Sequence, residues 1–305
     1  MKHGEPILLS IIIVNYKTSG DILRCIESII HYEKNYKKYE FIIVDNNSDD
    51  PGLEKIKKTF KFAKIIYAPR NGGFAYGNNI GISNSNGNYI FLLNPDTYIG
   101  DNSIEKLLNR IATDSDVHII GPKLLNTDGT NQSYILPKSY LTLWKLFCEQ
   151  LYLHRVFKNV RLFNSYFRTY MDYDKENFVE QVSGAAFMFR RDIIDTIGLL
   201  DENYFMYFEE SDYCLQAVKN GFKLLYYPAS KITHTQAAGT FSERAIRNFV
   251  NSFEHFFKKN FSHIVYYPAI CIFLTGSLLR LLKSLVLLDK KHRAYLYYLK
   301  CFVIR

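Results

Sequence analysis

Short apolar runs alternate with helical patterns through the first 125 residues of the chain. The run at 8–15 is almost continuously apolar, as in a strand that is buried on both faces of a sheet. The predicted strands are 8–15, 41–44, 64–68 and 89–93, and the predicted helices are 19–32, 51–60, 74–83 and 103–112. Strands separated by helices require crossover connections, so this pattern predicts an α/β fold with a mostly parallel sheet.

Polar residues follow each predicted strand at the point where the strand ends. They are Asn15; Asp45 and Asn46; Asn71 and Gly72; and Asn94 and Asp96. Ligands of open α/β sheets bind beyond the carboxyl ends of the strands, so these residues predict a ligand site. Alone, Asp45 and Asp96 are explained as turn residues, because Asp at a strand end commonly forms an Asx turn, but the two loops taken together favour a function.

A glycine pair opens the helix predicted at 74–83, in the order Asn71-Gly72-Gly73, and Asn79 lies further along this helix. Two glycines let the backbone approach a ligand closely, and a helix N-terminus favours an anion. The GxGxxG fingerprint and the P-loop motif are both absent from the sequence. Asp96, which lies close to Asn94, suits a hard divalent cation that would hold a diphosphate.

Three carboxylates lie within four residues at Glu209, Glu210 and Asp212, with aromatic residues on both sides. Mutual repulsion and desolvation raise a carboxyl pKa, which is the tuning that a general base requires. The alternative is a set of acids favoured by the dipole at a helix N-terminus. His234 follows a predicted strand and can ligate a metal or contact a phosphate, although a lone histidine is often structural.

The second half of the chain shows a less regular pattern than the first. Strands are predicted at 182–189 and at 222–227, the second ending at Pro228, and helices at 209–220 and 242–260. Ser242 is the expected N-cap of the last helix. The segment 137–178 is rich in aromatic and basic residues, and its helix-like spacing around 143–157 predicts helical or loop excursions over the site.

Positive charge is concentrated at the C-terminal end. Residues 251–305 carry nine Lys and Arg against two Asp and Glu, while the whole chain has a net charge of +8. Because phosphate contacts need concentrated positive charge, nucleic-acid binding by the nearly neutral body is disfavoured. The five cysteines are scattered and odd in number, which is typical of a reduced, cytoplasmic protein.

The uncharged run 264–279 would extend about 24 Å as a helix, less than the ~30 Å of a bilayer core. A helical wheel places Arg280, Lys283, Lys290 and Lys291 on one side and apolar residues opposite. This pattern predicts an amphipathic helix on a membrane surface, with its basic side towards anionic head groups. A C-terminal core helix or a homodimer helix is the alternative. We therefore expect a domain at 1–262 and a membrane-associating tail at 263–305. Deletion of residues 264–305 should release the protein from the membrane and leave the activity of the domain intact.

Seven segments together resemble the family 2 inverting glycosyltransferases, and most of all their rhamnosyltransferase-like branch in bacterial surface polysaccharide assembly. These segments are SIIIVNYKT (10–18), IIVDNNSDD (42–50), NGGFAYGNNIGI (71–82), FLLNPDT (91–97), SGAAFMFRRD (183–192), GLLDENYFMYFEESDYCLQA (198–217) and THTQAAGT (233–240). The resemblance covers about residues 8–260. It implies a GT-A fold, a nucleotide-sugar half at about 1–130, an acceptor half at about 131–262, and a divalent metal, Mg²⁺ or Mn²⁺.

The resemblance also implies roles for individual residues. Asp96 and His234 would hold the metal, and Glu210 would be the catalytic base, in a position where the family usually has Asp. Asp212 remains the rival base, because the additional methylene of Glu210 moves its carboxylate outward. The donor would contact residues of the strand-end loops and of the helix that follows the glycine pair, namely Asn15, Asp45, Asn46, Asn71, Gly72, Asn79, Asn94 and Asp96.

The function implied is transfer of a sugar, with rhamnose favoured, to a hydroxyl of a lipid-linked or growing glycan. The donor would be dTDP-rhamnose or a UDP-sugar, and the enzyme would lie on the inner face of the cytoplasmic membrane. Two alternatives stay open: a transferase of the same fold that uses a UDP-hexose, and a non-catalytic nucleotide-sugar-binding scaffold. Nucleotidyl transfer is disfavoured, because residues 13–21 lack a glycine-rich loop with a basic residue for a triphosphate.

Overall fold

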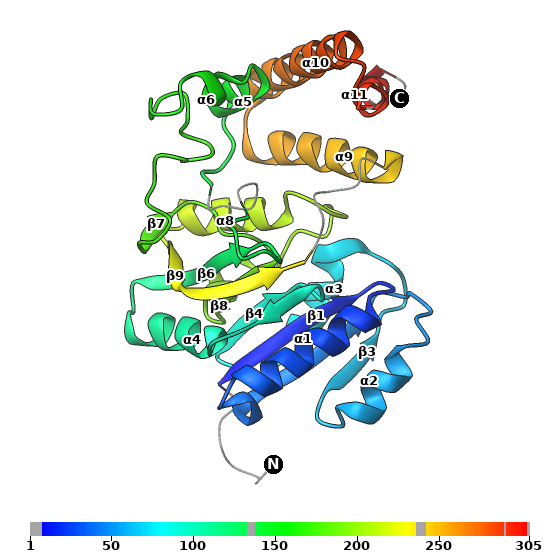
Figure 1. Cartoon of the computed structure of the whole chain (residues 1–305), viewed down its shortest axis with the longest axis vertical. Helices are drawn as coiled ribbons and strands as arrows, with labels where there is room; N and C mark the ends of the chain where they lie inside the picture. Colours follow the sequence, from blue (N-terminus) through cyan, green and yellow to red (C-terminus); the bar gives the residue numbers. More distant parts are fainter. Residues whose placement is uncertain (1–7, 133–137, 236–241, 290, 304–305) are drawn as a thin grey trace.

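The computed structural model describes residues 8–132, 138–235, 242–289 and 291–303 (Figure 1). The strands are β1 (Leu9–Asn15), β2 (Tyr39–Asp45), β3 (Lys64–Tyr67), β4 (Tyr89–Leu93), β5 (Thr97–Ile99), β6 (Val117–Leu125), β7 (Asn177–Val179), β8 (Ala186–Arg190) and β9 (Lys223–His234). The helices are α1 (Ser19–Tyr32), α2 (Leu53–Thr59), α3 (Gly73–Ser83), α4 (Ser103–Thr113), α5 (Leu143–Gln150), α6 (Leu153–Val156), α7 (Ile193–Ile197), α8 (Glu209–Lys219), α9 (Glu243–Asn260), α10 (His263–Val286) and α11 (His292–Val303).

The strands form one sheet in the order β3-β2-β1-β4-β8-β6-β9-β5, with β7 also paired to β9. The predicted α/β fold is confirmed, and β1 to β4 are parallel as expected. The whole sheet is mixed rather than mostly parallel, because β8 runs antiparallel to β4 and β6, and β5 and β7 run antiparallel to β9. The chain enters β8 at the carboxyl end of β4, where Leu93 pairs with Ala186, so β8 must run the opposite way.

Side chains of β1 alternate between two hydrophobic clusters. Ile11 and Ile13 pack on the side of α1, with Ile26, whereas Ile12 packs on the opposite side, with Ile82 of α3. Both faces of the strand are therefore buried, which explains the nearly continuous apolar run of its sequence. The N-terminal half of the fold follows directly from this pattern.

Two strand predictions need correction. Strand β9 does not end at Pro228 but continues to His234. Pro228 has no N–H to donate to the sheet, and a register shift in the pairing with β6, between Pro122 and Lys123, accommodates it. The strand predicted at 182–189 begins only at Ala186. The predicted helix at 242–260 is confirmed, and its cap is Ser242, whose Oγ accepts from the Ala245 N–H at 3.2 Å. Of the segment 137–178, residue 137 lies outside the described residues, and helices α5 and α6 occupy the predicted helical stretch.

The C-terminal helices form a layer above the sheet, with α9 between α8 and α10 (Figure 1). One hydrophobic cluster runs through this layer and crosses the predicted boundary between residues 262 and 263. It contains Leu141, Leu146, Tyr204, Phe208, Leu215, Phe253, Phe256, Phe257, Ala269 and Phe273. The tail therefore packs against the body through shared core residues.

Helix α10 is amphipathic, but its polar side faces the protein. Ser277 and Ser284 are buried, and the Arg280 guanidinium pairs with the Glu149 carboxylate of α5 at 2.9 Å. The expectation that Arg280 faces lipid head groups is therefore wrong, because its half-buried carboxylate partner holds it against the protein. Lys283 stays exposed, and Lys290 lies outside the described residues.

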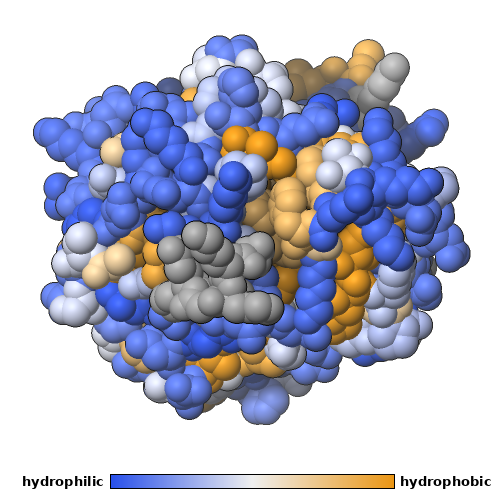
Figure 2. All heavy atoms as spheres, turned by 90° about the horizontal axis from the view of Figure 1, so that it is seen from below, coloured by the Kyte–Doolittle hydropathy of each residue, from blue (hydrophilic) through white to orange (hydrophobic). Residues whose placement is uncertain are grey.

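The outward face of α10 is a continuous apolar stripe. It consists of Ile264, Tyr267, Leu278, Leu279, Leu282, Leu285 and Val286, all exposed. With 24 residues, α10 is long and apolar enough to cross a membrane, which by itself is weak evidence for membrane contact. The opposite end of the molecule, seen from below in Figure 2, is mainly hydrophilic, with a band of hydrophobic residues on one side.

Candidate active site

The ends of β1 and β2 are joined by hydrogen bonds between the predicted site residues. The buried Asn15 amide donates to Asp45 Oδ1 at 2.8 Å and to Ser48 Oγ at 3.0 Å. Asp45 Oδ2 accepts from the Ser48 backbone N–H at 3.2 Å, a side-chain-to-backbone bond that closes the turn after β2. Asp45 therefore has the structural role that the sequence left open. Its hydrogen bonds hold together the loops that follow β1 and β2.

Asn46 connects these two loops to the loop that precedes α3. Its Nδ2 donates to Asn71 Oδ1 at 3.1 Å and to the Gly73 carbonyl at 2.9 Å, and its Oδ1 accepts from the Gly72 N–H at 3.2 Å. Gly73 has φ +88°, and a Cβ there would lie 2.0 Å from the Phe205 carbonyl oxygen. Gly73 is thus required by the close packing of this loop against the segment before α8, whereas a Cβ on Gly72 would meet the Tyr76 side chain.

Asn79 does not join the strand-end loops. Its amide donates to the Leu200 carbonyl at 2.8 Å and to Glu202 Oε1 at 2.9 Å, and its Oδ1 accepts from the Leu200 N–H at 3.1 Å. These bonds fix α3 to the segment around Leu200, and only 4% of Asn79 is exposed. The structure therefore places Asn79 in a bracing position.

Asp96 and His234 meet because β5 pairs with the end of β9. Asp96 Oδ1 lies 3.2 Å from His234 Nε2, and the Asn94 amide nitrogen lies 3.4 Å from the same ring nitrogen. Gln132 Nε2 donates to the His234 carbonyl at 2.7 Å, so Gln132 Oε1 faces His234 Nδ1, at 3.1 Å, and accepts its proton. This arrangement leaves Nε2 as the ring atom directed at the Asp96 carboxylate.

The Asp96–His234 pair fits a divalent cation. A carboxylate oxygen and an imidazole nitrogen 3.2 Å apart need a proton or a cation between them, and both atoms are common metal ligands. Among the residues that the structure describes, no group of three or more His, Cys, Asp and Glu side chains could hold a metal. The protein would therefore supply two ligands and leave the other positions to phosphate oxygens and water, as Mg²⁺ sites commonly do.

A cavity of about 360 Å³ opens beside Asp96. Its polar lining comes from α1, the strand ends and the loop after β6: Asp21, Arg24, Thr97, Tyr98, Thr127, Thr233 and Thr235. Residues 236–240 of the motif that contains His234 lie outside the described residues.

Glu210 lies in the first turn of α8, against the loop that enters β8. Its Cβ is 3.3 Å from the position that a Cβ on Gly184 would take, and Gln181 Nε2 lies 3.4 Å from its Oε1. The next residue of this loop, Ala185, accepts a backbone hydrogen bond from Asn94 at 2.9 Å. One loop thus connects the Glu210 carboxylate with the turn that carries Asp96.

Burial raises the pKa of the Glu210 carboxyl, while backbone hydrogen bonding and the positive charge of Lys138 act against this rise. Lys138 and Gln181 form an antiparallel bridge, which brings both side chains to the same part of the site. Burial, followed by repulsion from Glu210, raises the pKa of the neighbouring Glu209 well above its ordinary value. Glu210 therefore has the tuned environment that a general base needs.

Asp212 has a different environment from Glu210. It is buried, and its two oxygens accept from Lys259 Nζ and from Asn260 Nδ2, both at 2.7 Å. Lys259 also pairs with Asp201 at 2.7 Å, and His255 contacts the same Asp201 oxygen at 2.9 Å. These contacts tie α8 to α9, so the geometry favours a structural role for Asp212.

Replacing Asp212 by Asn is expected to lower the free energy of unfolding by about 1.5–3 kcal/mol, the range for a hydrogen bond to a charged group. The turnover of the folded enzyme should stay close to wild type, because the Asn260 contact can persist. Urea denaturation followed by initial-rate measurement checks both. Asp116→Asn is the matched control, since it breaks an exposed pair with Lys223 (2.6 Å) that is worth about 1 kcal/mol or less. A stable Asp212→Asn variant without turnover would instead make Asp212 the base.

Sequence reasoning missed four residues that complete these sites: Gln132, Lys138, Gln181 and Lys259. None of them lies in a recognisable motif, and each reaches its partner across a long stretch of sequence, so no spacing signal was available. The closest hint was the basic and aromatic composition of the segment that follows residue 137.

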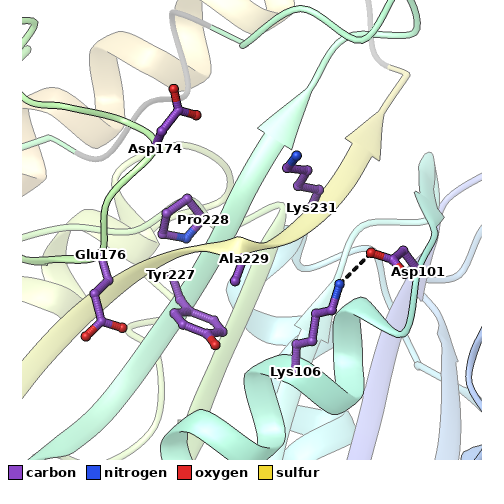
Figure 3. Close-up of a pocket in the computed structure, with 8 residues that line it drawn as sticks. All are labelled: Asp101, Lys106, Asp174, Glu176, Tyr227, Pro228, Ala229 and Lys231. Carbon is purple, nitrogen blue, oxygen red and sulfur yellow. Dashed lines mark hydrogen bonds and ion pairs between the residues drawn. The ribbon is translucent and has the colours of Figure 1, made fainter.

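A second cavity, of about 540 Å³, contains none of the predicted site residues (Figure 3). It is lined by Asp101, Lys106, Asp174, Glu176, Tyr227, Pro228, Ala229 and Lys231. Lys106 pairs with Asp101 at 2.5 Å across one side of it, and the acids Asp174 and Glu176 lie on the other side. This cavity is distinct from the cluster at the strand ends.

Comparison with known proteins gives one family. Residues 10–198 match the model of glycosyl transferase family 2. The chain is similar to the low-salt glycan biosynthesis hexosyltransferase Agl10 of Haloferax volcanii, with 30% identity over 219 residues, 68% of this chain. The chain spans 61% of the length of that relative.

Two solved structures show the same fold. The structure of GalNAc-T7 with UDP, GalNAc and Mn²⁺ has a TM-score of 0.59 at 16% identity and covers 82% of this chain and 48% of that chain. The structure of S. aureus TarS 1-349 has a TM-score of 0.56 at 13% identity and covers 97% of this chain and 80% of that chain. The GT-A-like α/β fold expected from the sequence is therefore confirmed.

Proposed function

This chain belongs to glycosyl transferase family 2, and on that premise we propose that it transfers a sugar from a nucleotide-diphosphate donor to a hydroxyl group of a glycan. The observation that carries the proposal is the convergence of three features at one edge of the sheet. These are the hydrogen-bonded strand-end loops, the Asp96–His234 pair and the half-buried Glu210 carboxylate, whose pKa is raised.

The donor nucleotide would lie over the loops that Asn15, Asp45, Asn46 and Asn71 tie together, with Gly72 and the start of α3 near its phosphates. The N-terminus of a helix favours an anion, which suits a diphosphate. The fold neighbours include complexes with UDP, which supports a nucleotide-sugar donor. We favour rhamnose as the sugar, from dTDP-rhamnose, and a UDP-hexose is the competing donor.

Asp96 and His234 would hold a divalent cation, Mg²⁺ or Mn²⁺, with Asn94 beside them. Such a cation neutralises the charge of a nucleoside diphosphate as it leaves. The chain's own contribution is to orient these ligands: Gln132 fixes the imidazole ring, and the pairing of β5 with β9 fixes the Asp96 backbone.

Glu210 would act as the general base. Its carboxylate accepts the proton of the acceptor hydroxyl while that oxygen bonds to the anomeric carbon of the donor sugar. The bond from the anomeric carbon to the diphosphate oxygen breaks, and its electron pair leaves with the nucleoside diphosphate. Attack from the opposite face inverts the configuration in one step, so no nucleophilic Ser or Cys is required.

Loss of the cation or of its carboxylate ligand is expected to abolish donor hydrolysis. Release of nucleotide from a panel of dTDP-rhamnose, UDP-sugars and GDP-sugars, with Mn²⁺ or Mg²⁺, should be restricted to one donor. It should fall at least about 100-fold in Asp96→Ala or after chelation. Asp101→Ala is the matched control, because Asp101 is an exposed acid that follows β5, whereas Asp96 precedes it. This variant should keep its activity. Equal hydrolysis with and without metal would contradict the assigned metal role.

We further propose that the enzyme lies on the inner, cytoplasmic face of the membrane, where a lipid-linked glycan could reach it. The apolar stripe on α10 supports contact with lipid, and the packing of its other side on α5 and α9 favours a helix that lies along the surface. A non-catalytic nucleotide-sugar scaffold is the second candidate, and the Glu210 variant described in the Discussion separates the two.

A further inference from the structure

Three cations surround a single aromatic ring at the junction of α6 and α10. The Arg155 and Arg280 guanidinium carbons each lie 4.9 Å from the centroid of the Tyr152 ring, and Lys283 Nζ lies 5.4 Å from it. Tyr152 directly precedes α6, and its positive φ of 56° turns the chain there. The cluster therefore combines residues that are more than 120 positions apart in the sequence.

Only one of these three cations has a carboxylate partner. Arg280 pairs with Glu149 at 2.9 Å and also donates to the Tyr152 hydroxyl at 3.1 Å. Arg155 and Lys283 are exposed, and within the described ranges neither has an acidic side chain at ion-pair distance. The nearby Asp289 carboxylate accepts from the Lys291 backbone N–H. The cluster thus carries an excess of two positive charges, and like charges held this close repel unless an anion lies between them.

Apolar residues border this cluster on the same surface. On α10, Leu279 and Val286 lie four and three residues from Lys283 and are 45% and 81% exposed, and Leu282, which directly precedes Lys283, is 51% exposed. On α6, Val156 follows Arg155 directly and is 70% exposed. A ligand that matches this surface has a compact anionic group joined to apolar chains.

We propose that Arg155 and Lys283, with Tyr152 between them, bind the phosphate group of an anionic membrane lipid while the α10 stripe contacts its acyl chains. The inference rests on the membrane association proposed above and gives it a specific residue basis. Arg280 braces the site through Glu149 and leaves the two exposed cations to the lipid. The membrane-binding surface of the protein therefore combines Tyr152 and Arg155 of the middle segment with α10 of the tail. The tail alone lacks Tyr152 and Arg155.

Binding to vesicles tests this proposal with the full-length chain. Wild type should bind vesicles of phosphatidylcholine with phosphatidylglycerol more tightly than vesicles of phosphatidylcholine alone. Arg155→Ala combined with Lys283→Ala should weaken binding to the anionic vesicles about 30-fold, from roughly fivefold for each basic residue at an anionic surface. Lys57→Ala combined with Lys58→Ala is the control, because it removes the same charge from exposed positions on α2.

Equal weakening by both double variants would overturn the site, since it would reduce the effect to net charge. Equal binding of wild type to both kinds of vesicle, together with binding of inorganic phosphate that the Arg155→Ala and Lys283→Ala double variant loses, would also overturn it, in favour of a soluble phosphate ligand. Donor hydrolysis is measured in parallel and should be unchanged in both double variants. If wild type hydrolyses the donor but binds no vesicles, the lipid site fails and the transferase proposal stands. If wild type binds vesicles as expected but hydrolyses no donor, the transferase proposal fails and the lipid site stands.

Discussion

Replacement of Glu210 by Gln is expected to lower the rate of sugar transfer by about 10²- to 10⁴-fold, the usual contribution of a general base. Gln keeps the shape of the side chain and can still contact Gln181, but it cannot accept the proton of the acceptor hydroxyl. Donor affinity and the midpoint of thermal unfolding should therefore change little. Initial rates with saturating donor and acceptor, together with a thermal unfolding curve, measure these three quantities.

The pH dependence of transfer gives a second readout for the same residue. Burial raises the pKa of Glu210, so its carboxyl binds a proton at a higher pH than an exposed glutamate does. The protonated form cannot act as a base, and the transfer rate should fall as the pH is lowered through this pKa. In Glu210→Gln, this acidic limb should disappear from the residual activity.

Glu209→Gln is the matched control, because Glu209 is the adjacent acid of the same helical turn and is also buried. It should keep most of the transfer rate. A larger loss in Glu209→Gln than in Glu210→Gln would show that the base is assigned to the wrong acid. Full activity of Glu210→Gln would favour the scaffold reading, in which the site binds a nucleotide sugar without reacting.

Removal of α10 and α11 is expected to destabilise the whole protein, and not merely to release it from the membrane. Phe273 of α10 is 5% exposed, and its ring lies 4.7 Å from that of Phe253 in α9. The point variant Phe273→Ala isolates this packing and should lower the free energy of unfolding by about 3–5 kcal/mol. Denaturant titration of the full-length chain, followed by circular dichroism, measures the change.

Leu282→Ala is the control for Phe273→Ala, because Leu282 lies on the exposed stripe of the same helix. Its effect should stay within about 0.5 kcal/mol. A chain ending at residue 262 should expose Phe253 and its neighbours and aggregate. A truncated chain that unfolds at the same denaturant concentration as wild type and still hydrolyses donor would contradict this prediction. It would show that the tail is an independent segment that the domain does not need for stability.

Much of the fold could be predicted from local pattern alone. The apolar run of β1, the helical spacing of α1 and the polar residues after each strand are all short-range features, so α/β layering and the strand-end site were accessible. The hydrogen bonds of Asn15 with Asp45 and of Asn46 with Asn71 follow from parallel strands that end at one edge. The predictions weakened after residue 125, where β8 and β9 pair with partners far away in the sequence.

The sequence alone determined which acids and loops meet at the carboxyl edge of the sheet, because hydrophobic periodicity and turn chemistry act over a few residues. The tertiary structure decided what each of those groups does. Glu210 and Asp212 are two residues apart and chemically similar, but Lys259 of α9 neutralises Asp212, while Glu210 faces Lys138 and Gln181. Glu149 likewise holds Arg280 of α10 inward, while Lys283 stays exposed. Such partners are set by long-range packing, which no local pattern in the chain encodes.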